Sequence, residues 1–170
     1  MRTQRTAKLL LAGNVVAMTM LVMPLFILDL FHENYSTLSL TTKGYFYVVI
    51  MGIVFAVVLG YETYHLNRKY WLYIFVASIM GTIVPHHVPY NLQGNIHLIL
   101  AYLSFGVIAS ITYMNVFTHY NSMLMNGFTL MLCILVICFM KFMMINIVAE
   151  LCAMMYVLFT NMYLYYKMKR

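Results

Sequence analysis

The stretch Gly81–Phe105, GTIVPHHVPYNLQGNIHLILAYLSF, differs from the rest of the chain in its polar residues. It is the one place where several polar side chains interrupt a chain otherwise built of apolar runs. Those side chains are His86, His87, Asn91, Gln93, Asn95 and His97. In a membrane protein, polar groups at or below the lipid surface cost free energy unless something satisfies or uses them. The stretch therefore predicts the position of a site.

The composition excludes an ordinary soluble domain. The 170 residues are 64% hydrophobic and only 8% charged, whereas soluble domains carry about 25% charged residues. A membrane span needs roughly 20 apolar residues, so six spans with short connections use the whole chain. We therefore expect an all-α, polytopic integral membrane protein, a six-helix bundle that forms a single transmembrane domain over residues 1–170. The expected spans are at about residues 9–28, 44–61, 70–84, 96–117, 123–140 and 145–166.

The basic residues predict the orientation of these spans. With six spans, both termini and the second and fourth turns share one side, which then holds eight of the ten Lys and Arg residues. The other side holds only Lys43 and Lys141. The positive-inside rule assigns the basic side to the cytoplasm, so we expect a cell-membrane protein with both termini cytoplasmic. Because the net charge of +6 sits at the ends of apolar runs, the lipid bilayer is the expected partner and nucleic acid is not.

The third apolar run, Tyr70–Val84, is unusually short. Fifteen residues of helix cover roughly 22 Å, less than the ~30 Å hydrocarbon core. Pro85 and Pro89 prevent the run from continuing as regular helix. Either the helix starts earlier, in the preceding basic turn, or the connection PHHVPYNLQGN is drawn below the lipid surface.

Two helix faces carry small or polar residues at helical spacing. Gly52, Ala56 and Gly60 form a row on the second span that lets another helix approach closely. A second row, on the fourth span, should face into the bundle because lipid would reject it. Its members are His97, Ala101, Ser104, Ile108, Thr112, Asn115 and His119.

The six-span topology gathers the unusual polar residues at the outer face. We expect them to line an outward-facing polar pocket, with His97 as its centre because it opens a span on the inward row. The alternative is that His97 only caps the helix or bonds to Asn95 or a backbone carbonyl. Glu150 is expected to pair with Lys141, and Glu62, near a span end, to be an interfacial carboxylate. The candidate ligand-binding residues are His97, Asn95, His87, Ser104, Asp29 and Glu150.

No metal or other cofactor is expected. His86, His87 and His97 with a nearby carboxylate offer the residue types that bind Zn²⁺, but their spacing matches no ligand motif. His97 and His119 are separated by 22 residues, roughly 33 Å of helix, which places them at opposite surfaces and argues against haem. The three cysteines lie in apolar runs and are interpreted as small apolar residues rather than as disulfides or ligands.

A family resemblance rests on the same central stretch. The pattern Gly81-x-x-x-Pro85, followed by His97-x-x-x-Ala101-x-x-Ser104-Phe105, resembles the middle of a group of small six-span bacterial membrane proteins. That group is similar to the DRAM and fibroblast-growth-factor-receptor-activating-protein (Frag) families. The resemblance implies a six-helix integral membrane protein with no settled enzymatic activity, and it transfers no catalytic residue.

Three functions remain open from the sequence. The leading hypothesis is a non-enzymatic membrane protein that binds a lipid-like or small amphipathic molecule, or a membrane-protein partner, in a pocket between the third and fourth spans. The alternative is a membrane-embedded hydrolase or transferase that uses His97 with Asp29, Glu33 or Glu150 as acid, base or metal ligands. The third is a small transporter, although no span has a paired Gly or Pro break at mid-depth.

Overall fold

The computed structural model describes residues 2–30, 32–85, 92–119, 121–142 and 145–168, with residues 2–5 as backbone alone. Within these ranges the chain is all-helical and contains no strand. The elements are α1 (Arg2–Val22), the 3-10 helix η1 (Met23–Phe26), α2 (Tyr35–Leu38), α3 (Thr42–Leu66), α4 (Trp71–Ile83), α5 (Leu92–Thr118), α6 (Ser122–Phe142) and α7 (Ile147–Met168).

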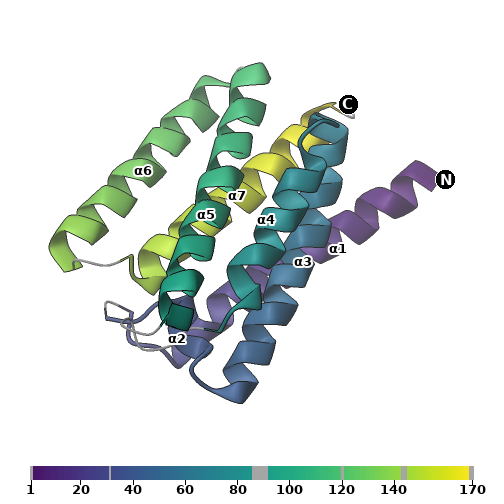
Figure 1. Ribbon diagram of the computed structural model, residues 1–170. Coiled ribbons are helices and arrows are strands. Elements are labelled where there is room, and N and C mark those ends of the chain that lie inside the picture. The colour runs from purple at the N-terminus through teal and green to yellow at the C-terminus, as the bar shows by residue number, and fades with distance from the viewer. Residues whose placement is uncertain (1, 31, 86–91, 120, 143–144, 169–170) are drawn as a thin grey trace.

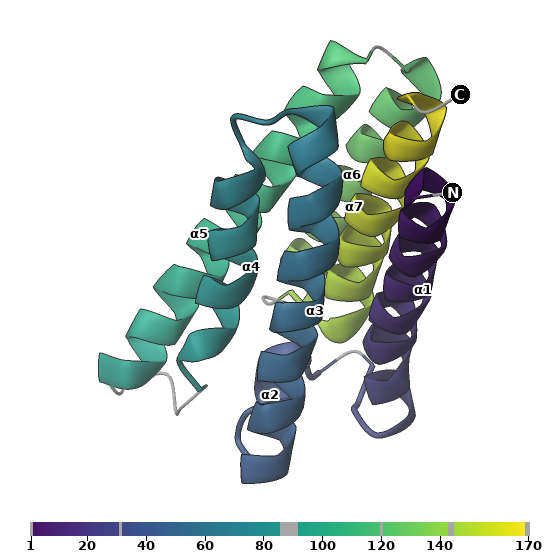
Figure 2. The same cartoon turned by 90° about the vertical axis from the view of Figure 1, so that its right-hand side faces the viewer.

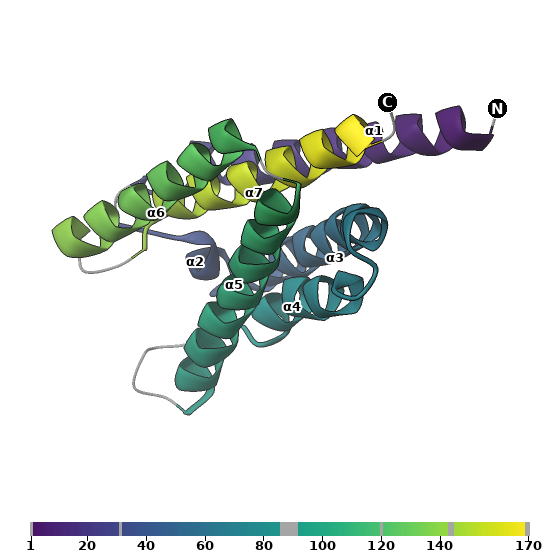
Figure 3. The same ribbon diagram turned by 90° about the horizontal axis from the view of Figure 1, so that it is seen from above.

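The long helices run alternately up and down, and both termini lie at the same end of the bundle (Figures 1 and 2). The hydroxyl of Tyr166 donates a 2.8 Å hydrogen bond to the carbonyl of Ala7, which ties the end of α7 to the start of α1. Seen from above, α1, α7 and α6 form one layer and α3, α4 and α5 the other, with α2 between them (Figure 3). This arrangement leaves α2 and its flanking loop to close the opposite end.

Among the described residues, five helices are long and apolar enough to cross a membrane, which supports a transmembrane protein. The sixth, α4, has 13 residues and is about 20 Å long. It begins at Trp71, so the expectation that it might start earlier, in the basic turn, is wrong. The connection after Pro85 falls on residues 86–91, which lie outside the described residues.

The other helix boundaries differ modestly from the expected ones. At the first span, α1 ends at Val22 because Pro24 has no N–H to donate, and η1 follows it. The second span extends to Leu66 rather than to residue 61, and the fourth begins at Leu92 rather than at residue 96. The longer α3 places Glu62 inside the helix, where it is fully buried, so the expectation of an interfacial carboxylate is wrong.

The row of small residues on α3 makes the close helix contact predicted from the sequence. A Cβ atom added to Gly52 would lie 2.5 Å from Thr82 Oγ1 and 3.1 Å from the Ser78 carbonyl oxygen, both on α4. A Cβ added to Gly60 would lie 3.3 Å from the ring of Phe75, and Ala56 is fully buried. The backbones of α3 and α4 therefore approach more closely than larger residues would allow.

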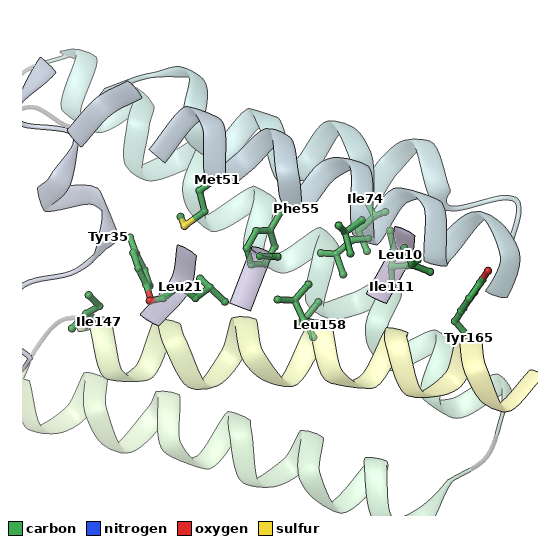
Figure 4. Packing of buried hydrophobic residues seen from close by; sticks show 14 residues of the cluster. Leu10, Leu21, Tyr35, Met51, Phe55, Ile74, Ile111, Ile147, Leu158 and Tyr165 are labelled. Carbon is green, nitrogen blue, oxygen red and sulfur yellow. The ribbon is translucent and has the colours of Figure 1, made fainter. Parts of the chain in front are cut away.

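The main apolar cluster lies between the two layers. Figure 4 shows Met51 and Phe55 of α3 pointing toward α7, from which Leu158 points back. Leu21 of α1 and Tyr35 of α2 meet at one end of this cluster. Met51 and Phe55 also line the cavity described below.

Replacing Gly52 by Ala should lower the melting temperature of the detergent-solubilised protein, because the new methyl group would push α4 away. The matched control is Gly106→Ala on α5, where an added Cβ meets no atom within 4 Å. The control should leave the melting temperature unchanged or raise it, since Ala favours helix by about 1 kcal/mol over Gly. Equal effects of the two substitutions on the melting temperature would contradict the close α3–α4 contact.

Candidate ligand-binding site

A cavity of about 280 Å³ lies between α2, α3, α4, α5 and α7, with Leu135 of α6 at its edge. Three of its polar lining residues lie at one end: Ser36 of α2, and His97 and Glu150 near the starts of α5 and α7. Two others, Ser78 and Ser104, come from the middle of α4 and α5. Four apolar residues on successive turns of α3 lead away from that end: Val48, Met51, Phe55 and Leu59. The cavity therefore runs along the bundle for about 16 Å of helix, with a polar end and an apolar wall.

The short helix α2 forms the polar end of the cavity. Asn34 caps it: the Asn34 side chain accepts from the Thr37 N–H, and the Thr37 hydroxyl bonds in return to the Asn34 N–H. The Tyr35 hydroxyl donates a 2.5 Å hydrogen bond to the carbonyl of Leu21 on α1. Burial, with a smaller contribution from Glu150, raises the pKa of Tyr35, so the hydroxyl stays a neutral donor.

The start of α7 holds the same segment through the side chain of Glu150. Its Oε2 accepts a 2.7 Å hydrogen bond from the backbone N–H of Tyr35, and the Ile147 N–H donates to the Glu33 carbonyl at 2.8 Å. The expected pairing with Lys141 is wrong: the Lys141 ammonium lies 5.3 Å from the centroid of the Phe142 ring. Glu150 Oε1 forms no hydrogen bond with the described residues, so this oxygen is available to a ligand.

His97 connects three elements at the polar end. Its side chain is buried, with 3% of the residue exposed. Nδ1 lies 2.6 Å from the Val84 carbonyl oxygen and Nε2 lies 2.8 Å from Ser36 Oγ. Because a carbonyl oxygen only accepts, Nδ1 carries the hydrogen, and in the neutral ring Nε2 accepts from the Ser36 hydroxyl.

Both sequence-based expectations for the placement of His97 are therefore met. Its ring faces the bundle and contacts a polar group of the loop after the first span, and it also bonds to a backbone carbonyl. Its ring nitrogens already have protein partners, so the residue positions the polar end whether or not a ligand touches it. Its part in ligand binding stays a prediction.

The remaining members of the polar row on α5 also face inward. Ser104 lines the cavity and donates a 2.7 Å hydrogen bond to the Ala77 carbonyl on α4. Deeper in the bundle, Asn115 Nδ2 donates to Asn161 Oδ1 at 3.0 Å, and Asn161 Nδ2 lies 3.4 Å from Thr112 Oγ1. These contacts attach α5 to α4 and to α7.

The structure does not bring the other candidates to the cavity. Asn95 is exposed and is not among the lining residues. Asp29 is exposed too and lies 3.1 Å from His32, while Glu33 accepts from the Asp29 N–H at 2.7 Å. His87 lies outside the described residues, as does His86. Of the residues that the sequence suggested as acids and bases of an enzyme, only His97 and Glu150 are among the described residues that line the cavity.

No group of three or more His, Cys, Asp or Glu side chains that could hold a metal ion occurs within the described ranges. The three cysteines, Cys133, Cys138 and Cys152, are free thiols. The residues that sequence reasoning missed are Asn34, Tyr35 and Ser36, which lie in the expected connection after the first span and form the cap and start of α2. The spacing of Asn34 and Thr37, which is typical of a helix N-cap, was the available signal.

These features define a class of protein: a helical transmembrane bundle with a cavity that is polar at one end. No family model, no curated protein and no solved structure matches the chain. The resemblance to the small six-span bacterial proteins and to the DRAM and Frag families stays a prediction.

Replacing His97 by Ala should lower the melting temperature more than Ser36→Ala does. The first change removes hydrogen bonds to both α2 and the end of α4, each worth about 1 kcal/mol, whereas the second removes only one of them. His32→Ala serves as the control because its side chain is 76% exposed. If His97→Ala and His32→Ala melted at the same temperature, the connecting role of His97 would be excluded.

Proposed function

We propose that this chain is a six-span integral protein of the cell membrane, with both termini cytoplasmic, that binds a lipid-like or small amphipathic molecule. The single observation that carries the proposal is the cavity of about 280 Å³ with a polar end and an apolar wall. The volume is near the lower end of the usual range for ligand pockets, roughly 300–1,000 Å³. Such a shape suits one polar head and one apolar chain.

The charge of the lining favours particular head groups. Glu150 is the only acidic residue among the described lining residues, which include no Lys or Arg. Its Oε1 accepts no hydrogen bond from the residues that the structure describes, so it favours a head group that donates hydrogen bonds, such as an amine or a hydroxyl. An anionic head group would meet the carboxylate without a cation to offset the repulsion.

The apolar wall would receive the chain of the ligand. Met51, Phe55 and Leu59 face the cavity from α3, and Ile108 and Val157 face it from α5 and α7. Burying apolar surface contributes about 25 cal/mol per Å². In a membrane, however, the chain leaves lipid rather than water, so selectivity should depend on the head group more than on the chain.

Binding can be tested with single-chain amphiphiles of one chain length that carry an amine, a hydroxyl or a carboxylate. Native mass spectrometry of the purified protein in detergent should show the amine and the alcohol bound in preference to the carboxylate. Glu150→Gln should remove the preference for the amine, because the amide is uncharged. Equal binding of all three amphiphiles to the parent protein would count against Glu150 as the selecting group.

Filling the cavity should abolish binding altogether. Ala101→Phe places a large ring on the α5 wall of the cavity, whereas Ser110→Phe adds the same ring at an exposed position of the same helix. We expect the first variant to lose amphiphile binding and the second to retain it. Retention of binding by a folded Ala101→Phe variant would place the ligand elsewhere and remove the basis of the proposed function.

The topology is tested separately by cysteine labelling in a variant without the three native cysteines. Lys167→Cys, at an exposed position near the C-terminus, should react with a membrane-impermeant reagent only after the cells are opened. Lys43→Cys, exposed at the other end of the bundle, should react in intact cells. The reverse pattern would overturn the cytoplasmic placement of the termini.

A further inference from the structure

A second buried polar site lies between α1 and α3, outside the lining of the cavity. Glu62 of α3 is fully buried, and its Oε1 accepts a 2.7 Å hydrogen bond from Nδ2 of Asn14 on α1. Asn14 is fully buried as well. The two helices are close here: a Cβ added to Gly13 would lie 3.0 Å from Val58 Cγ2. The carboxyl group is therefore enclosed by protein.

The side chains of Glu62 and Asn14 have more buried hydrogen-bond acceptors than donors to satisfy them. Asn14 Nδ2 donates both to Glu62 Oε1 and to the Leu10 carbonyl, at 3.1 Å, which fixes the orientation of the amide. Asn14 Oδ1 and Glu62 Oε2 are both buried, and neither has a hydrogen-bond partner among the residues that the structure describes. Two acceptor oxygens on neighbouring side chains thus lack a donor, although buried polar atoms are nearly always hydrogen-bonded.

No basic side chain compensates the carboxyl group. Every Lys or Arg whose side chain the structure describes is exposed, and the one ion pair within the described ranges joins His32 and Asp29. On the helices packed against this part of α3, the described titratable groups are Lys8 on α1, Tyr73 on α4, and Tyr163, Tyr165, Tyr166 and Lys167 near the end of α7. On α3 itself, Tyr61, Tyr64 and His65 lie within one turn of Glu62.

None of these groups supplies a counter-charge. Lys8 and Tyr73 are exposed. The ring of Tyr165 packs against Tyr61 and His65 of α3 itself, and Tyr166 donates to Ala7. Within the described part of the chain, the one hydrogen bond of the Glu62 carboxyl group comes from the amide of Asn14.

We propose that Glu62 and Asn14 form a proton-binding site, in which Glu62 is a neutral carboxylic acid with its proton on Oε2. The O–H then donates to Asn14 Oδ1 while Asn14 Nδ2 donates to Oε1, so that acid and amide form a pair with two hydrogen bonds. This one proton supplies the donor that both orphaned oxygens lack. It also removes the charge, which buried without a partner would cost far more than a hydrogen bond contributes.

The occupancy of this site is linked to the packing of α1 on α3. Release of the proton to water leaves a carboxylate that Asn14 alone cannot neutralise, and the carboxylate then needs water or a cation between the helices. Glu62 is therefore protonated when α1 packs closely on α3, and separation of the two helices favours release of the proton. The site would couple proton uptake to a helix movement within the membrane.

Infrared spectroscopy of the protein in detergent at neutral pH tests the proposal directly. A protonated carboxyl group has a carbonyl stretching band that a carboxylate lacks, and the chain contains only four acidic side chains, Asp29, Glu33, Glu62 and Glu150. Because Glu150 is a second carboxyl group without a basic partner, the measurement is made in a Glu150→Gln background. We expect the band in that variant, its loss when Glu62→Gln is added and its retention when the matched control Glu33→Gln is added instead. A band unchanged by Glu62→Gln would overturn the proposal.

A second preparation keeps the test valid if Glu62→Gln fails to fold. In a Glu33→Gln, Glu150→Gln double variant labelled with ¹³C at the glutamate carboxyl groups, only Glu62 can contribute an isotope-shifted carboxylic acid band. Its presence supports the proton site, and its absence excludes it. This measurement does not depend on the cavity, so its outcome is independent of amphiphile binding.

Melting temperatures separate a proton from a metal cation as the occupant. Glu62→Gln should melt near the parent temperature, because the glutamine amide supplies the same donor and acceptor. Glu62→Leu should melt lower, because Asn14 then keeps only the Leu10 carbonyl as a partner. If Na⁺ raised the melting temperature of the parent but not that of Glu62→Gln, the site would hold a cation and the proton assignment would be wrong.

Discussion

The hydrogen bond from the backbone N–H of Tyr35 to the carboxylate of Glu150 is the interaction on which the outer end of the molecule depends. It joins a loop that follows the first helix to the start of the last one, 115 residues later. The Tyr35 hydroxyl attaches the same segment to α1, and Ser36 attaches it to His97 of α5. Three helices of the two layers thus meet on one four-residue helix, which contributes Ser36 to the polar end of the cavity beside His97 and Glu150.

Much of the fold could be predicted from the sequence because a bilayer restricts the alternatives. The apolar runs predicted the five long helices and the shorter α4. The steps of three and four residues predicted the inward face of α5 and the contact of Gly52 with α4. These patterns depend only on the geometry of one helix and on the exclusion of polar groups from lipid. Helix ends were less certain, because α3 and α5 continue past residues that look like the start of a loop.

The site could be predicted only in part, because its partners come from segments far apart in the chain. His97, Ser104 and Glu150 were recognised as unusual residues, and all three line the cavity. Lys141 was the expected partner of Glu150 because opposite charges near one turn suggest a pair, but a backbone N–H from a distant loop takes that place. Likewise, the position of Glu62 near a span end suggested an interfacial carboxylate. In the structure its side chain is buried and bonded to Asn14 of another helix. Sequence spacing does not reveal such contacts across the bundle.

The length of α4 has a consequence for the membrane itself. Its exposed apolar residues, which include Leu72 and Val76, face outward from the bundle, yet the helix is about 20 Å long against a hydrocarbon core of about 30 Å. In the six-span arrangement that we propose, lipid beside α4 would thin to match this helix, and hydrophobic mismatch of this kind costs fractions of a kcal/mol per Å. The protein should therefore be more stable among lipids with short acyl chains, and α4 should mark the side at which the bilayer is locally thinned.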